Sequence, residues 1–341
     1  VYPSGYGYPS VIAFLSLLSG VPVQLLQMGS SIWLAVLCLM AFVCYRELLG
    51  HPGAAAGGVL LLLLQPDFLF YALRASHEKI TWLYVLGVLY VLSKSYGLAR
   101  TPRVMGPYIA VLCLLLWAVV ATNMFFASAF FTSLVLCFAG GWIMLQWNRL
   151  KKKSRTAAST RVWRLVSVGL ICVILIYLNI NYIYAPAAVY YGSLSYFVDR
   201  VSVLILGAEG PPRQAEQPYE YLQSAWISQR HYLMLIAPQL FFTLAAGITW
   251  LWQAVRNLFT DWEALPWPRQ LLWLICGAVG VQFAVGVTID VAGALNFANI
   301  QVRLFPYLAL VLSPLLAGAI LTVYRRLSRL RILQGLAVLV M

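Results

Sequence analysis

The sequence predicts an all-α fold, a polytopic bundle of transmembrane helices. Of the 341 residues, 62% are hydrophobic and only 10% are charged, whereas roughly a quarter of the residues in ordinary globular domains are charged. Runs of about 20 apolar residues recur along the whole length, and each can cross a hydrocarbon core of about 30 Å. Short polar loops with most of the lysines and arginines separate these runs. The pattern indicates a single integral-membrane domain, residues 1–341, with about nine to ten spans.

The chain begins with an aromatic segment that is not expected to be a regular helix. Residues 1–9 hold three tyrosines, two prolines and two glycines, a composition typical of turns. Residues 10–18 are apolar but too few to cross a bilayer, so they predict an interfacial or re-entrant helix. The first complete span is predicted over 24–45. The second is predicted over 53–70, with a kink or an end at Pro66, which cannot donate a backbone hydrogen bond.

Seven further spans follow from the same pattern, together with one incomplete span. They are predicted over 80–96, 105–122, 124–147, 163–185, 231–255, 268–289 and 303–324, and the incomplete one begins near Ile332. Thr122 and Asn123 predict a tight turn between two of them. Residues 186–230 are the longest stretch without a span, and we expect a loop with a short amphipathic segment at 189–206. Because the chain starts without methionine and stops within an apolar run, we expect a fragment truncated at both ends.

A loop rich in lysine and arginine, residues 149–164, sets the expected orientation of the bundle. It contains no aspartate or glutamate, and short loops of this kind stay on the cytoplasmic side of a membrane. Counting spans from this loop places several segments on the outer side, namely 1–9, 74–79, 122–123, 186–230 and 290–303. We therefore expect an integral, multi-pass protein of a bacterial-type plasma membrane, with loop 149–164 cytoplasmic and loop 186–230 outside.

The net charge of +13 fits the same arrangement. The basic residues are divided among several short loops, where they meet anionic lipid headgroups. Membrane lipid is therefore an expected partner, and nucleic acid is not. The six cysteines all fall inside apolar runs, without a CxxC motif or a Cys/His cluster, so neither a disulfide framework nor a zinc site is indicated. The residues indicate no certain cofactor and leave a divalent cation open.

Two groups of charged residues are candidates for chemistry, because charge near a membrane is costly. Arg74, His77, Glu78 and Lys79 crowd one short outer loop. They form either an interfacial cluster with its own salt bridge, or an anion-handling site. In such a site Arg and Lys would hold a phosphate, and His or Glu would handle a proton.

The second group contains Asp290, at the end of one apolar run, and Arg303, at the start of the next. They predict either an ion pair that closes a helical hairpin or a ligand site in the same compartment as the first group. Tyr6 and Tyr8 of the first segment are either ordinary interfacial anchors or part of a rigid aromatic turn.

Three parts of the chain resemble membrane glycosyltransferases of the GT-C superfamily. The Tyr/Pro/Gly turn at 2–9, followed by the apolar stretch 10–20, is similar to a turn that leads into a short helix in those enzymes. Residues 65–78 resemble their next outer loop. Residues 303–307 and 313–318 are similar to a late span with an arginine at its outer end. The resemblance implies a GT-C-like helical bundle.

The resemblance also implies an inverting transferase that uses a polyprenyl-phosphate sugar on the outer face. Arg303 or Arg74 would neutralise the lipid phosphate, and Glu78 or His77 would contact sugar or acceptor. The catalytic carboxylate of the superfamily lies just after the first span, but no acidic residue precedes Glu47 here, so Glu78 and His77 are only weak catalytic candidates. The expected substrate-binding residues are Tyr6, Tyr8, Arg74, His77, Glu78, Lys79, Asp290 and Arg303.

A second hypothesis is a non-catalytic integral-membrane subunit that packs against other membrane subunits. It predicts that the charged residues of the two groups pair with one another or with partner chains. A transporter would need ionisable groups near the middle of the membrane, and the predicted spans hold almost none.

Overall fold

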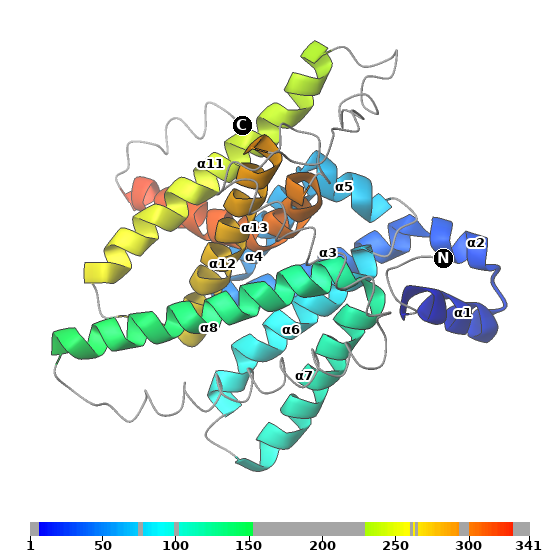
Figure 1. Cartoon of the computed structure of the whole chain (residues 1–341), viewed down its shortest axis with the longest axis horizontal. Helices are drawn as coiled ribbons and strands as arrows, with labels where there is room; N and C mark the ends of the chain where they lie inside the picture. Colours follow the sequence, from blue (N-terminus) through cyan, green and yellow to red (C-terminus); the bar gives the residue numbers. More distant parts are fainter. Residues whose placement is uncertain are drawn as a thin grey trace.

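The structure is a computed structural model that describes residues 7–73, 78–98, 102–152, 229–259, 262, 265–292 and 300–329 (Figure 1). Eleven α-helices and no strand occur within these ranges, in agreement with the predicted all-α class. The helices are α1 (Gly7–Ser19), α2 (Val23–Met28), α3 (Ser30–Leu49), α4 (Pro52–Leu63), α5 (Pro66–Leu73), α6 (Glu78–Leu98), α7 (Pro102–Thr122), α8 (Met124–Lys152), α11 (Gln229–Phe259), α12 (Trp267–Ala292) and α13 (Ile300–Arg329).

The N-terminal part differs from the prediction in two places. The turn expected over residues 1–9 is wrong for its last three residues, because α1 begins at Gly7. Pro9 is compatible with this start, since a proline in the first helical turn removes no intrahelical hydrogen bond. The span expected over 24–45 starts later than predicted, because the chain breaks at Gly29 between α2 and α3, and the apolar segment long enough to cross a membrane is Ile32–Leu49.

The second predicted span is bent at the expected place. Helices α4 and α5 meet at an angle of 80° around Leu64 and Gln65, directly before Pro66. The start of α4 is capped by His51, whose Nδ1 accepts a hydrogen bond from the Ala54 backbone N–H at 3.2 Å. Because of the bend before Pro66, the short helix α5 runs in a different direction from α4.

The spans predicted over 80–96, 105–122, 124–147, 231–255, 268–289 and 303–324 all lie within helices, which are α6, α7, α8, α11, α12 and α13. The turn at Asn123 is confirmed, and its Oδ1 accepts from the Phe126 N–H at 3.1 Å. One boundary is wrong: residues 149–152, expected in the basic loop, form the last turn of α8. The segments 163–185 and 186–230 and the incomplete span lie outside the described residues.

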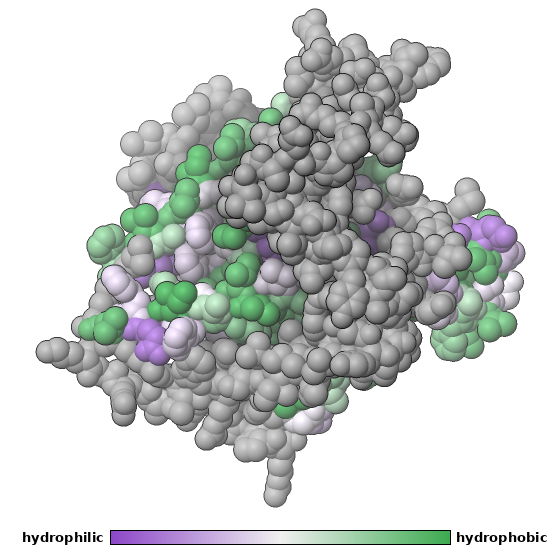
Figure 2. Space-filling view, viewed as in Figure 1, coloured by the Kyte–Doolittle hydropathy of each residue, from purple (hydrophilic) through white to green (hydrophobic). Residues whose placement is uncertain are grey.

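Within the described ranges, three helices are long and apolar enough to cross a membrane, and the bent pair α4–α5 would make a fourth. The count of nine to ten spans therefore stays a prediction. Helix α11 adds a long apolar surface, on which large hydrophobic side chains are exposed (Figure 2). They are Leu240, Phe241, Leu244, Ile248 and Leu251.

Helix α13 lies at the centre of the bundle and packs against α4, α11 and α12 (Figure 1). Its residues from Leu304 to Leu315 are all buried. Small residues allow close contact with α4: a Cβ on Gly58 would lie 3.4 Å from the Cα of Pro314. Around this centre, α3 packs on α6, α6 on α7, and α8 on α12.

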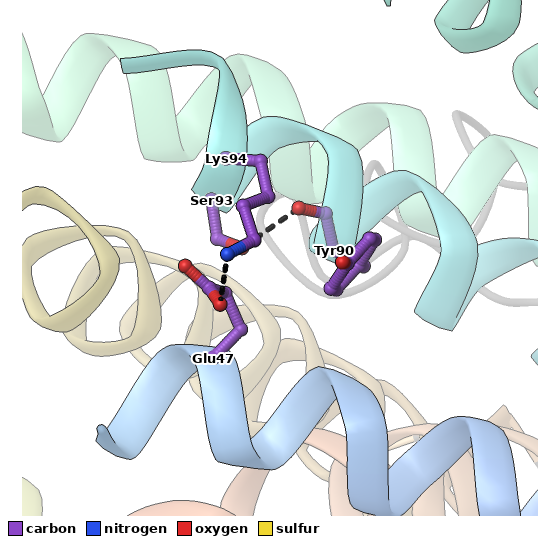
Figure 3. Close-up of polar contacts among 4 residues, drawn as sticks. All are labelled: Glu47, Tyr90, Ser93 and Lys94. Atoms are coloured by element: carbon purple, nitrogen blue, oxygen red, sulfur yellow. Dashed lines mark hydrogen bonds and ion pairs between the residues drawn. The ribbon is translucent and has the colours of Figure 1, made fainter. Parts of the chain in front are cut away.

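The antiparallel contacts define two ends of the bundle. At the first, the Thr81 end, the Thr81 Oγ1 on α6 donates to the Thr122 Oγ1 on α7 at 3.2 Å. At the second, the Trp267 end, the Trp267 Nε1 donates to the Leu92 carbonyl oxygen at 2.9 Å. Figure 3 shows another contact near the Trp267 end, the ion pair of 2.7 Å between Lys94 on α6 and Glu47 on α3.

Candidate functional site

The structure describes five of the eight expected site residues. Tyr6, Arg74 and His77 lie outside the described residues. Tyr8 is half-buried in the first turn of α1, and Glu78 and Lys79 are the first two residues of α6. For Asp290 on α12 and Arg303 on α13, the structure gives the position on the helix but not the side chain.

Glu78 and Lys79 occupy contrasting positions at the start of α6. A helix N-terminus carries a partial positive charge, so it favours the carboxylate of Glu78 and disfavours the ammonium of Lys79. Glu78 is half-buried, whereas Lys79 is 0% exposed. Lys79 precedes the predicted span 80–96, and burial lowers its pKa, an effect that the neighbouring Glu78 carboxylate opposes. A buried cation at this position is costly and is therefore a candidate for function.

An aromatic cluster lies directly beside these two residues and joins four helices. The ring of Trp82 on α6 stacks on Phe68 of α5, with centroids 4.8 Å apart. Trp82 also meets Phe126 of α8 edge-on at 6.2 Å, and Phe126 meets Tyr307 of α13 at 6.3 Å. Lys79 and Trp82 are three residues apart on α6, so they share one face of the helix. The cluster thus fixes α5, α8 and α13 around the start of α6.

Asp67 and Gln239 add a polar contact that the sequence did not predict. Asp67 lies in the first turn of α5, and its carboxylate is hydrogen-bonded to the side chain of Gln239 on α11. The available signal was a glutamine inside an apolar run, next to Pro238. The contact attaches α5 to a helix far away in the sequence.

The helix ends place Asp290 and Arg303 at the Thr81 end as well. Gln282 on α12 donates to the Ser133 Oγ on α8 at 2.6 Å, and Asp290 lies about two turns further along α12. Arg303 lies about one turn before Tyr307, which contacts Phe126 at the start of α8. The starts of α6, α8 and α13 therefore lie together with the ends of α7 and α12.

This end of the bundle combines carboxylates with cations, which can bind an anion and move a proton. Across the described ranges, no group of three or more His, Cys, Asp or Glu side chains could hold a metal ion.

The apolar composition and the helices long enough to cross a membrane indicate an integral membrane protein, and its all-helical fold is GT-C-like. It is similar to the solved structure of the archaeal oligosaccharyltransferase AglB from Archaeoglobus fulgidus, in complex with an inhibitory peptide and a dolichol-phosphate. The TM-score is 0.58 and the sequence identity 16%. The match covers 98% of this chain but only 44% of AglB, so this chain spans less than half the length of that protein. No protein-family model and no curated protein matches the sequence.

Proposed function

We propose that this chain is the membrane part of a glycosyltransferase that takes a sugar from a polyprenyl-phosphate donor. One observation carries the proposal: in a GT-C-like bundle, Glu78, Lys79, Asp290 and Arg303 come from three distant helices to one end. The dolichol-phosphate bound to AglB is a lipid phosphate of the same chemical kind. We place the reaction at the Thr81 end.

The proposed roles follow from the charges that develop during the reaction. When the bond between sugar and phosphate breaks, negative charge grows on the phosphate leaving group, and a cation placed there lowers the barrier. Arg303 supplies that cation, with Arg74 as a second candidate. The acceptor must lose a proton, and Glu78, or His77 beside it, accepts that proton or positions the acceptor.

The orientation is part of the proposal. The basic residues at the end of α8 hold the Trp267 end on the cytoplasmic side, which places Glu78 and Arg303 at the outer face. A bacterial-type plasma membrane, and further subunits around the chain, belong to the same proposal.

The test measures transfer by membranes that contain the full chain. Radiolabelled polyprenyl-phosphate monosaccharides serve as donors, and the loss of label from the lipid-extractable fraction is followed. We expect Arg303→Ala and Glu78→Gln to reduce the rate by about 100-fold or more, the usual effect of a removed proton-transfer or charge-stabilising group.

Matched controls use the same residue types near the other end of the bundle. Arg46→Ala and Glu47→Gln on α3 remove one cation and one carboxylate there, and we expect transfer to remain within about twofold of the wild type, because surface charges of this kind contribute little. Unchanged transfer in Arg303→Ala and Glu78→Gln would refute the site. Absence of transfer by the wild type with every donor would favour a non-catalytic subunit.

A further inference from the structure

Helices α8 and α13 both extend past the start of α12 at the Trp267 end. The contact between Gln282 and Ser133, and the approach of Gly140 to Leu274 at 3.3 Å, fix the antiparallel register of α8 and α12. In this register, Trp147 is level with Trp267, the first residue of α12. Residues 148–152 of α8 therefore project beyond α12, as Figure 1 shows.

Helix α13 projects in the same way. The thiol of Cys276 on α12 donates to the Val311 carbonyl oxygen at 3.2 Å, which makes Ile320 level with Trp267. Residues 321–329 thus lie beyond this level. We name residues 148–152 and 321–329 the α8 overhang and the α13 overhang.

The length of α8 gives an independent reason for its projection. Its 29 residues correspond to about 43 Å, whereas a hydrocarbon core is about 30 Å thick. Because α8 begins at the capped turn around Asn123, the part of the helix that exceeds the thickness of the hydrocarbon core lies at the Trp267 end.

Each overhang combines exposed apolar side chains with basic residues. On α8, Ile143 and Trp147 just before the overhang and Leu150 within it follow one helical face, and they are 60%, 48% and 78% exposed. The chain there also contains Arg149, Lys151 and Lys152.

On α13, Val323 and Tyr324 are 55% and 64% exposed, and exposed Arg325 and Arg326 follow them directly. Arg329 is the last residue of the helix. Both overhangs therefore combine exposed apolar side chains with cations that are close to them in the sequence.

Neither overhang contains an aspartate or glutamate. Elsewhere near this end, Glu47 is already engaged by Lys94 at 2.7 Å. In the sequence that connects α11 and α12, Asp261 and Glu263 are balanced by Arg256 and Arg269. Arg46 at the end of α3 and Arg103 at the start of α7 also lie at this end, so the overhangs carry part of its net positive charge.

We propose that the α8 and α13 overhangs bind the headgroups of anionic phospholipids in the adjoining leaflet. Apolar residues such as Trp147 and Leu150 lie among the upper acyl chains, and the basic residues meet the phosphates. This order matches the aromatic and basic zones at membrane interfaces, and clusters of Lys or Arg next to a span attract anionic lipid. The site lies at the opposite end from the proposed transferase site and does not depend on it.

The experiment is a titration of the full-length, delipidated chain in detergent with phosphatidylglycerol or phosphatidylcholine, read by native mass spectrometry. We expect the wild type to bind phosphatidylglycerol at least about tenfold more tightly, and added salt to reduce this difference. In the variant Arg149→Gln/Lys151→Gln/Lys152→Gln, the affinity for phosphatidylglycerol should fall by about fivefold for each charge removed.

Two control variants separate headgroup binding from general effects of charge or folding. Arg149→Lys/Lys151→Arg/Lys152→Arg keeps all three charges and should retain the preference. Arg200→Gln/Arg213→Gln/Arg230→Gln removes three charges elsewhere in the sequence and should also retain it. Equal affinity of the wild type for both lipids would overturn the proposal, even if a variant failed to fold. An equal loss in the two neutralising variants would overturn it as well.

Discussion

The hydroxyl of Tyr45 on α3 donates a hydrogen bond of 2.5 Å to the backbone carbonyl oxygen of Leu310 on α13. This carbonyl is the one that Pro314 leaves without its intrahelical partner, because proline has no N–H to bond the residue four positions earlier. Two residues 265 positions apart in the sequence thereby satisfy a backbone group in the centre of the bundle. Tyr45 is the compensation that makes a proline acceptable inside the most buried helix.

The first prediction concerns this pair. Tyr45→Phe keeps the ring but leaves the Leu310 carbonyl without its donor, so we expect the free energy of unfolding to fall by about 1–3 kcal/mol. Pro314→Ala restores an N–H for the same carbonyl, so the effect of Tyr45→Phe should be smaller in that background. The free energies of unfolding of the wild type, the two single variants and the double variant, measured in mixed detergent micelles, complete this double-mutant cycle. Equal effects in both backgrounds would contradict the assignment.

The second prediction concerns the close contact between α11 and α12. A Cβ on Gly277 would lie 2.6 Å from Cζ2 of Trp250, whose ring stacks on Trp273 with centroids 5.1 Å apart. We expect Gly277→Ala to destabilise the protein by about 1–3 kcal/mol, because a rigid indole must move.

Gly280 on the same helix is the matched control, since nothing within 4 Å would meet its Cβ among the described residues. Gly280→Ala should be neutral or stabilising by up to about 1 kcal/mol through helix propensity. Thermal unfolding of both variants in the same detergent shows whether Gly277→Ala is less stable than Gly280→Ala. Similar stabilities for the two variants would show that the indole adapts.

The third prediction concerns Trp82 beside the candidate site. The side chain is fully buried, and among the described residues its Nε1 has no hydrogen-bond acceptor, so its contribution comes from packing on Phe68 and Phe126. Trp82→Ala should cost about 3–5 kcal/mol, and Trp82→Phe about 1–2 kcal/mol, since phenylalanine keeps an aromatic ring there. Far-ultraviolet circular dichroism during denaturation measures both. A cost of Trp82→Phe as large as that of Trp82→Ala would indicate a polar role for the indole.

The fourth prediction concerns the ion pair between Lys94 and Glu47. The two side chains are 40% and 26% exposed, so solvent screens their attraction despite the distance of 2.7 Å. A double-mutant cycle with Lys94→Met and Glu47→Gln should give a coupling energy of at most about 1 kcal/mol. High salt should reduce it further. A coupling of about 3 kcal/mol or more would mean that the pair behaves as a buried one.

Much of the helical pattern was predictable because it depends on neighbours in the sequence. Apolar runs of the length of a bilayer predicted six described helices, from α6 to α13, and Pro66 predicted the bend before α5. The two helix boundaries that were predicted wrongly also depend on residues that are close in the sequence. Gly29 interrupts an apolar stretch without a strong break signal, and the basic residues at the end of α8 continue the helix because Arg and Lys are good helix formers.

The candidate site was predictable only in part. Charge near a membrane singled out Glu78 and Lys79, but nothing in the sequence indicated that Lys79 is fully buried. The contact between Asp67 and Gln239 was missed because it joins residues on α5 and α11. Periodicity reports the environment of one helix, and it does not report which helix lies opposite.

The sequence by itself determined the class of this protein, a bundle of apolar helices, because hydrophobic length and the placement of Lys and Arg are properties of single segments. Only the tertiary structure decided which ends meet, which carbonyl Tyr45 satisfies and that α8 and α13 project at the Trp267 end. The physical reason is that all apolar helices are alike to the hydrocarbon around them. Small residues, buried polar groups and aromatic contacts, which act only once helices have packed, select the arrangement.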